Sequence, residues 1–223
     1  MSDFDKGMAQ SKERAGSAYN GYGMLIALLA IVAFCVAFFA TGLGPTLGPA
    51  IGLPILILSA LSFILIAIGF FMVQPNQAVV ITLFGEYRGT VRTEGLQWIW
   101  PWMGKKKLSV RAHNIHSDKV KINDLRGNPI EVACNVVWRV ADTAQAVFDV
   151  DDYKEFVNIQ IEAGLRTVGA RHPYDDMSDE DETTLRGSAD VVNAELIEEL
   201  NDRLRVAGIM VDEAGLTHLA YAP

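Results

Sequence analysis

The chain contains few cysteine and histidine residues, which form disulfides or take part in catalysis in many small proteins. It has two cysteines, Cys35 and Cys134, and four histidines among 223 residues. Two cysteines are too few for a disulfide framework, which favours a reducing compartment. Neither cysteine has a neighbouring base that would activate it as a nucleophile. A Gly-x-Ser-x-Gly elbow and a glycine-rich phosphate loop are also absent from the sequence, which removes two common classes of catalytic motif.

The histidines and acidic residues do not form a recognisable metal or catalytic pattern either. His113 and His116 are spaced so that, on a strand, their side chains lie on opposite faces, which is poor metal geometry. His172 precedes Pro173 and is typical of a helix end. The acidic cluster at residues 175–182 lacks the glycine and the spacing of a calcium loop and resembles a solvated helix start. We therefore expect no enzyme activity, no metal and no cofactor.

Charge is absent from two long apolar runs, residues 24–40 and 50–73, which have 17 and 24 residues. About 20 apolar residues are needed to cross a bilayer as a helix, so these runs predict a transmembrane hairpin. The uncharged turn at residues 41–49 is compatible with two full crossings or with a re-entrant hairpin. A cleaved signal peptide and a pair of buried core helices are the alternatives, and the long leader of mixed charge disfavours the first.

Lysine and arginine indicate the sidedness of this hairpin. The leader carries Lys6, Lys12 and Arg14, the turn carries none, and many basic residues follow residue 73. The positive-inside rule then predicts an integral cell-membrane protein whose leader and soluble domain face the cytoplasm. Tyr19 and Tyr22 precede the first run and fit an interfacial aromatic belt.

The net charge of −8 conceals an uneven distribution. Residues 74–140 hold ten Lys and Arg against five Asp and Glu, whereas residues 141–223 hold six against nineteen. A basic lobe next to the bilayer suits an anionic cytoplasmic leaflet, and the alternative is an ordinary solvated surface. The acidity of the second lobe argues against nucleic acid as a partner.

Hydrophobic patterning predicts an α+β soluble part in two lobes. Residues 130–140 alternate cleanly and form the clearest half-buried strand. The first lobe is therefore expected to be an antiparallel β-unit with further strands at residues 78–84, 108–113 and 115–122. The expected organisation is a cytoplasmic leader (1–23), the hairpin (24–73), a β-lobe (74–141) and an α/β lobe (142–223).

The α/β lobe is expected to contain a short helix at residues 142–150 and two longer helices. Residues 151–171 carry an apolar stripe at helical spacing, and Pro173 ends that helix. Ser178 and Asp181 form a possible capping box for a helix over residues 182–206. Gly208 suits the C-terminal cap of that helix, and residues 209–219 return to a strand.

One segment combines aromatic and basic residues in a way that favours membrane contact. Three tryptophans occur within five residues and a lysine triplet follows shortly after. Tryptophan favours the membrane interface, and lysine is attracted by anionic lipid. The alternative is that the tryptophans belong to the core of the β-lobe and the lysines to a solvated turn. The expected membrane-contact residues are Trp98, Trp100, Trp102, Lys105, Lys106 and Lys107.

Several strings, taken in order, resemble the SPFH (band 7) family of stomatins, prohibitins, flotillins and HflK/HflC-like proteins. They include Gln74–Val80, Gly95–Pro101, Asp124–Ile130, Val136–Val140 and Leu216–Pro223. The resemblance covers residues 74–223 and implies a membrane scaffold that forms homo-oligomers, organises lipid microdomains and regulates partners such as membrane proteases or channels.

The chain departs from this family pattern in two places. Similar proteins continue past the final Ala-Pro into a long helix that helps assembly, whereas this sequence ends at Pro223, so we expect a fragment or a weakened assembly. Gly215 stands where similar proteins often carry a basic residue. Two rival functions remain: a membrane-anchored enzyme with an unrecognised site, and an accessory subunit of a transport complex. The second rival is disfavoured because the apolar runs lack ionisable residues.

Overall fold

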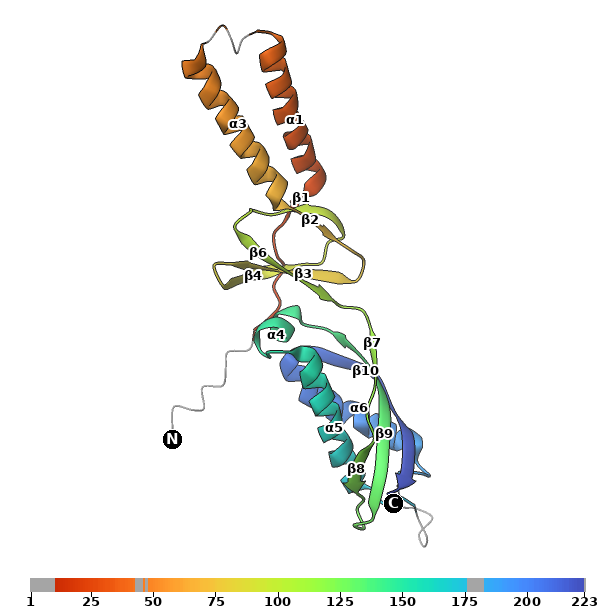
Figure 1. Cartoon of the computed structure of the whole chain (residues 1–223). Coiled ribbons are helices and arrows are strands. Elements are labelled where there is room, and N and C mark those ends of the chain that lie inside the picture. Colours follow the sequence, from red (N-terminus) through yellow and green to blue (C-terminus); the bar gives the residue numbers. More distant parts are fainter. Residues whose placement is uncertain (1–10, 43–45, 47, 176–182, 223) are drawn as a thin grey trace, which may run out of the picture. The chain divides into compact units, whose positions relative to one another are not determined.

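The computed structural model describes residues 11–42, 46, 48–175 and 183–222, which fold as a mixture of helices and strands. The chain divides into two compact units. The N-terminal unit is Arg14–Leu108, and the C-terminal unit is Ser109–Pro223 together with the segment that ends at Glu13. Each unit is built around its own sheets (Figure 1).

The division between the units does not follow the lobe boundary expected after residue 141. Strand β9 (Pro129–Val140) pairs along its length with strand β10 (Ile209–Tyr221). Pairing of this kind fixes β9 in the C-terminal unit, although it precedes the helices in the sequence. The boundary therefore lies at Leu108, before the strand that the sequence assigned to the first lobe.

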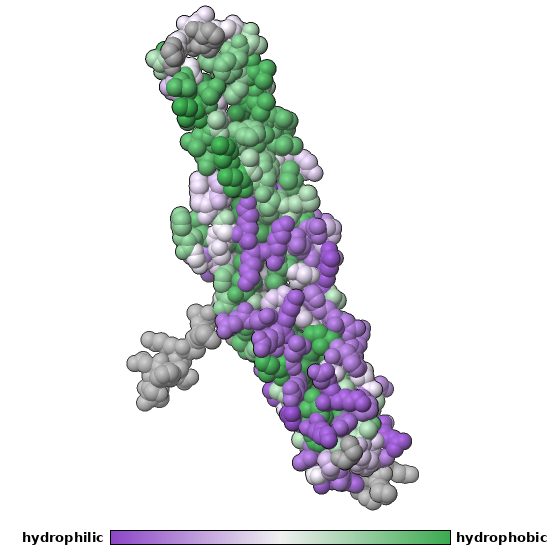
Figure 2. All heavy atoms as spheres, viewed as in Figure 1, coloured by the Kyte–Doolittle hydropathy of each residue, from purple (hydrophilic) through white to green (hydrophobic). Residues whose placement is uncertain are grey.

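Two apolar helices, α1 (Gly21–Ala40) and α3 (Pro49–Gly69), contain most of the two uncharged runs. Both are long and apolar enough to cross a membrane, and Figure 2 shows the hydrophobic surface that they present. Helix α1 begins before Met24 because the side chain of Asn20 accepts a hydrogen bond from the backbone N–H of Tyr22, at 2.9 Å.

A polar contact joins the two apolar helices. The thiol of Cys35 in α1 donates to the hydroxyl of Ser59 in α3, with 3.2 Å between Sγ and Oγ. The Ser59 hydroxyl in turn donates to the carbonyl oxygen of Leu56 at 2.9 Å. Small polar side chains commonly link helices in apolar surroundings. Cys35 therefore occupies a helix-packing position.

Helix α3 ends at Gly69, so the second predicted membrane-spanning segment, which was to continue through Val73, is four residues shorter than expected. These residues form strand β2 (Phe70–Val73), which pairs antiparallel with strand β5 (Gly95–Trp98). Aromatic and β-branched residues favour strands, and the pairing supplies partners for backbone groups that would otherwise end the helix unpaired.

The N-terminal unit contains two three-stranded sheets, in the orders β1-β5-β2 and β4-β3-β6. Helix α1 follows β1 directly, and helix α3 continues directly into β2, so both helices arise from the first sheet. Apolar residues from both sheets form one core cluster, which includes Phe71, Val79 and Ile99. The remaining strands are β1 (Tyr19–Asn20), β3 (Gln77–Leu83), β4 (Glu86–Val91) and β6 (Met103–Ser109).

The C-terminal unit has one antiparallel sheet in the order β10-β9-β7, with β8 also paired to β9. The long alternating strand was predicted correctly. The strand expected at 108–113 overlaps only the end of β6 and the first residue of β7 (His113–His116), and the strand expected at 115–122 is divided between β7 and β8 (Val120–Asn123). Their limits differ because the paired register with β9 ends at His116 and resumes at Val120.

Helices α5 (Tyr153–Arg171) and α6 (Ala189–Leu204) pack on the sheet of this unit, after the short helix α4 (Thr143–Phe148) (Figure 1). The apolar stripe expected on α5 is buried, as is the stripe on α6. A 3₁₀ turn, η2 (Arg205–Ala207), follows α6, and Gly208 then takes the left-handed conformation at φ 64°. The predicted glycine cap is confirmed in this position.

Helix α6 begins at Ala189, later than expected. Residues 185–187 form a turn before the helix, and the Thr184 hydroxyl accepts a hydrogen bond from the N–H of Gly187 at 2.8 Å. Such side-chain bonds offer the backbone an alternative to the helix. The expected capping pair, Ser178 and Asp181, and most of the acidic cluster lie outside the described residues.

Candidate membrane-contact surface

The predicted membrane-contact residues lie on the end of strand β5, on strand β6 and on the turn between them, at the base of the two apolar helices. Trp98 lies on β5, the central strand of the sheet from which both helices arise. It is paired with Tyr19 of β1 on one side and with Phe70 of β2 on the other. The side chains of this region therefore surround the point where the apolar helices meet the folded domain.

Trp98 is part of the protein interior. Its side chain is 3% exposed, and its indole N–H donates to the carbonyl oxygen of Ile66 in α3, with 2.8 Å between the atoms. Gly69 makes this approach possible, because a Cβ atom at that position would collide with the indole and with the carbonyl oxygen of Ile99. Trp98 consequently fixes the end of helix α3 to the sheet.

Trp100 and Trp102 extend outward from this buried indole. The ring centroids of Trp98 and Trp100 lie 5.2 Å apart, and those of Trp100 and Trp102 lie 4.9 Å apart in a stacked pair. Their exposed fractions are 43% and 51%. The three indoles thus form one continuous aromatic cluster that runs from the core to the surface.

Lys105 caps the C-terminal end of helix α3. Its ammonium group donates to the carbonyl oxygens of Ile68 and Gly69, both at 3.2 Å, and lies 5.4 Å from the ring centroid of Phe71. The last carbonyls of a helix lack intrahelical partners and carry the negative end of its dipole, so a cation there is stabilising. Burial, and secondarily the positive charge of Lys107, lower the pKa of Lys105.

Lys106 and Lys107 remain available to solvent or lipid. Both are exposed, and they lie on strand β6, where successive side chains point to opposite faces. Lys107 therefore shares a face with Lys105, and Lys106 lies on the other face. The lysine triplet combines one structural cation with two surface cations, which the sequence alone does not distinguish.

Three further exposed side chains belong to the same region. Tyr19, Tyr22 and Met72 are all exposed beside the ends of the apolar helices. The rings of Tyr19 and Trp98 lie 5.9 Å apart. Tyr19 and Tyr22 together with Trp100 and Trp102 define the aromatic belt, which is the name used for these four residues. Met72 was not expected here, because the sequence placed it inside the second apolar run.

A separate exposed aromatic residue was missed by the sequence reasoning. Phe84 and Gly85 form the two-residue turn between β3 and β4, with φ values of 50° and 90°. The Phe84 side chain is 90% exposed. A positive φ is costly for a bulky residue, and such turns usually hold Asn, Asp or Gly. The Phe-Gly pair between two strand patterns is the sequence signal that could have identified it.

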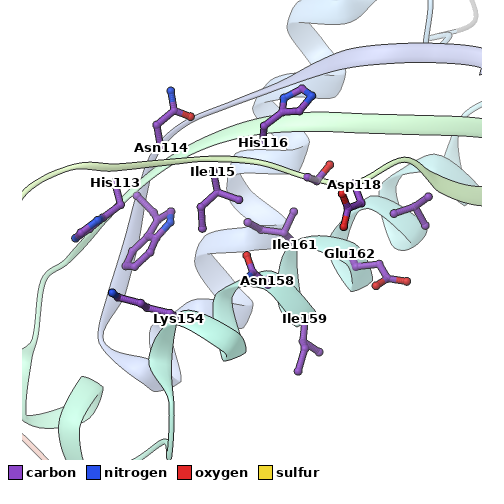
Figure 3. Close-up of a pocket in the computed structure, with 13 residues that line it drawn as sticks. His113, Asn114, Ile115, His116, Asp118, Lys154, Asn158, Ile159, Ile161 and Glu162 are labelled. Carbon is purple, nitrogen blue, oxygen red and sulfur yellow. The ribbon is translucent and has the colours of Figure 1, made fainter.

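The histidines lie where the sequence predicted. His113 and His116 point to opposite sides of β7, and His172 follows the last residue of α5, where its Nε2 atom lies 2.5 Å from a carboxylate oxygen of Glu195 (Figure 3 for the first two). Within residues 11–42, 46, 48–175 and 183–222, no three histidine, cysteine or acidic side chains lie close enough to hold a metal ion.

The fold and this surface define a class: an α+β domain attached to two apolar helices that indicate membrane association. A model of the SPFH domain / Band 7 family matches residues 71–223, which is more than half of the sequence. The chain therefore belongs to this family of membrane scaffolds. No curated protein matches the chain in a direct comparison.

Proposed function

We propose that this protein is a membrane-anchored SPFH scaffold that assembles into homo-oligomers, organises the surrounding lipid and controls access of partner membrane proteins. The observation that carries the proposal is the family match over residues 71–223, directly after two helices long enough to cross a bilayer. Work of this kind needs assembly and positioning, and no bond is made or broken by the protein. We accordingly propose that it is not an enzyme.

The anchor in this proposal is the helical hairpin, with the folded domain held at the cytoplasmic leaflet. The aromatic belt and Lys106 and Lys107 support this placement, because aromatic side chains favour the interface and each basic residue near an anionic surface contributes about 1 kcal/mol. The membrane protease or channel partners implied by the family belong to the same proposal.

The uneven charge of the two units supports assembly. The N-terminal unit holds six Lys and Arg against two Asp and Glu, whereas the acidic residues outnumber the basic ones in the C-terminal unit. Contact between the basic unit of one copy and the acidic unit of the next would be heterologous, and such contacts form a ring when the rotation between copies closes. Screening by salt should then weaken the assembly.

The topology can be tested with single cysteines in a chain whose two native cysteines are replaced by serine. Ser109→Cys is expected to react with a membrane-impermeant maleimide only in inside-out vesicles, and Thr46→Cys only in right-side-out vesicles if the hairpin crosses fully. Labelling of Thr46→Cys from neither side indicates a re-entrant hairpin, which retains the anchor. Reaction of Ser109→Cys in right-side-out vesicles contradicts the proposed cytoplasmic placement.

A further inference from the structure

Strand β7 leaves one edge of the C-terminal sheet open. In the order β10-β9-β7 it is the last strand, and within the described part of the chain no strand pairs with its outer side. The backbone N–H of Ser117 donates to the carbonyl oxygen of Cys134 in β9 at 2.9 Å. Because antiparallel strands bond at alternate residues, the backbone groups of Asn114 and His116 point outward from the sheet. These unpaired groups can template another strand.

A cavity of about 580 Å³ runs along this open edge, between β7 and helix α5. Figure 3 shows Asn114 and His116 pointing away from α5, whereas Ile115 points toward it. A strand that paired with β7 would also alternate, so every second side chain of that strand would enter the cavity. An open strand edge beside a cavity for alternate side chains is the arrangement by which domains bind extended peptides.

The two ends of the cavity differ in charge. Strand β7 and helix α5 run in the same direction, so Lys154 lies near His113 at one end, and Asp118 and Glu162 lie at the other (Figure 3). Both acids are exposed, and Glu162 is paired with Arg166 at 2.7 Å. Apolar side chains line the middle, among them Ile115 and Ile161.

The basic end also contains two buried polar atoms that have no hydrogen-bond partner among the described residues. These are Nε2 of His113 and Nε1 of Trp138, on rings that stack with centroids 4.7 Å apart. Trp138 is 1% exposed and lines the cavity. Burying an indole N–H without an acceptor costs free energy. A carboxylate placed beside Lys154 would bring an acceptor to this end.

We propose that this edge and cavity bind an extended peptide segment of a partner protein by strand addition to β7. The segment places an apolar side chain against Ile115 and Ile161, an acidic side chain beside Lys154 and a basic side chain beside Asp118. A second copy of the chain fits less well, because its own edge, His113–His116, carries no acid for Lys154. The inference rests on the proposed scaffold role, for which it identifies a partner-binding site.

The test uses a fluorescent, blocked peptide, Thr-Lys-Thr-Ile-Thr-Glu-Thr, and the full-length protein in detergent. In antiparallel pairing, Lys, Ile and Glu face the cavity, and the two threonines that flank Ile direct their N–H groups toward β7. Fluorescence anisotropy is expected to show saturable binding. N-methylation of these two threonines should weaken binding about tenfold or more, whereas N-methylation of Ile, whose N–H points away, should not.

Variants of the protein test the same geometry from the other side. Asn114→Pro removes an outward N–H that the fold does not use, and it should weaken binding about tenfold while the melting temperature stays unchanged. Lys154→Glu should weaken binding, and exchange of the peptide's Glu for Lys should restore it. Arg205→Glu changes a charge outside the cavity and is the matched control.

Three outcomes overturn the proposal. They are absence of saturable binding, equal affinity for both N-methylated peptides, and loss of oligomer mass in Asn114→Pro with peptide binding intact, which would assign the edge to contact between copies. Peptide binding and assembly mass are separate readouts. Failure of the peptide test therefore leaves the scaffold role intact, and a monomeric protein that still binds the peptide contradicts the scaffold role alone.

Discussion

The indole N–H of Trp98 donates to the carbonyl oxygen of Ile66 across 2.8 Å and so joins strand β5 to the last turn of the second apolar helix. The two residues are far apart in the sequence, and the bond lies where the apolar hairpin becomes a folded domain. Trp98→Phe keeps an aromatic ring but removes the donor, and it leaves the carbonyl oxygen of Ile66 without this partner.

We expect Trp98→Phe to lower the stability of the detergent-solubilised protein by about 1–3 kcal/mol, the cost of an unmade buried hydrogen bond. The measurement is the thermal unfolding midpoint. Trp100→Phe is the matched control, because that indole is partly exposed and should change the midpoint little. Equal effects of the two substitutions would show that the bond to Ile66 does not stabilise the junction.

Substitution of Gly69 should destabilise the protein about as much as substitution of Trp98, the residue whose indole it contacts. A methyl group in Gly69→Ala would collide with the Trp98 ring and the Ile99 carbonyl oxygen, so overpacking of about 1–3 kcal/mol is expected. Gly23→Ala in helix α1 has no atom within 4 Å of the added methyl group and should be neutral or slightly stabilising. The unfolding midpoints of the two variants provide the comparison, and similar midpoints would contradict the described contact.

Lys105 and Lys106 should behave differently although they are adjacent. Lys105→Met removes the cation that caps helix α3 and is expected to cost about 0.3–1 kcal/mol. Lys106→Met removes an exposed charge from the opposite face of β6 and should leave the midpoint unchanged. The order of the two variants should be reversed for binding to anionic lipid. Lys106→Met should lose more affinity for the lipid than Lys105→Met. A larger loss of lipid binding in Lys105→Met would argue against this division of roles.

The stability of the C-terminal unit should depend on Glu195 at low pH. Hydrogen bonds from Arg171, and then from His172, hold the pKa of Glu195 below its ordinary value of 4.5. The ionised form is therefore favoured by folding, and its contribution is complete above pH 4.5 and is lost as the pH falls through the lower, folded-state pKa. Glu195→Gln should flatten this part of the curve of stability against pH.

Glu198→Gln is the control for that experiment, because Glu198 is an exposed residue of the same helix. Urea unfolding at a series of pH values from about 3 to about 7 provides the curves. The lower limit lies below the ordinary pKa values of carboxyl side chains. Parallel curves for Glu195→Gln and the unmodified protein would show that the contacts with Arg171 and His172 do not favour the ionised carboxylate.

Contact of the aromatic belt with lipid can be measured by fluorescence quenching in liposomes that contain brominated lipid. The chain has four tryptophans, and two of them, Trp100 and Trp102, are partly exposed in the belt. Replacing both by Phe should remove most of the quenching. Trp138→Phe removes a buried indole of the other unit and should leave the quenched fraction at least as large. Undiminished quenching in the double variant would refute lipid contact by these side chains.

Hydrophobic periodicity was sufficient to predict those helices and strands whose pattern lies within one continuous segment of the sequence. The alternation along residues 130–140 predicted β9, and the stripe of Val157, Ile161, Leu165 and Val168 predicted α5, because both patterns are read from one segment. The family resemblance, which depends on the order of short strings, is confirmed over residues 71–223.

Features that depend on distant partners could not be predicted in this way. The apolar run to Val73 does not show that its last residues pair with β5, and the lysine triplet does not show that Lys105 reaches helix α3. Likewise, Glu13 accepts hydrogen bonds from both the N–H and the hydroxyl of Thr143, each at 2.9 Å, across most of the sequence. Each of these contacts joins segments that carry no shared local pattern.

The central claim, that the protein is an assembling membrane scaffold, is tested most directly by the native mass of the full-length chain extracted together with its lipids in polymer nanodiscs. Mass photometry at low salt should give particles that exceed empty nanodiscs by many times the 24.4 kDa mass of the chain, and this excess should fall as the salt concentration rises. A particle that contains one copy of the chain at every salt concentration would contradict the account.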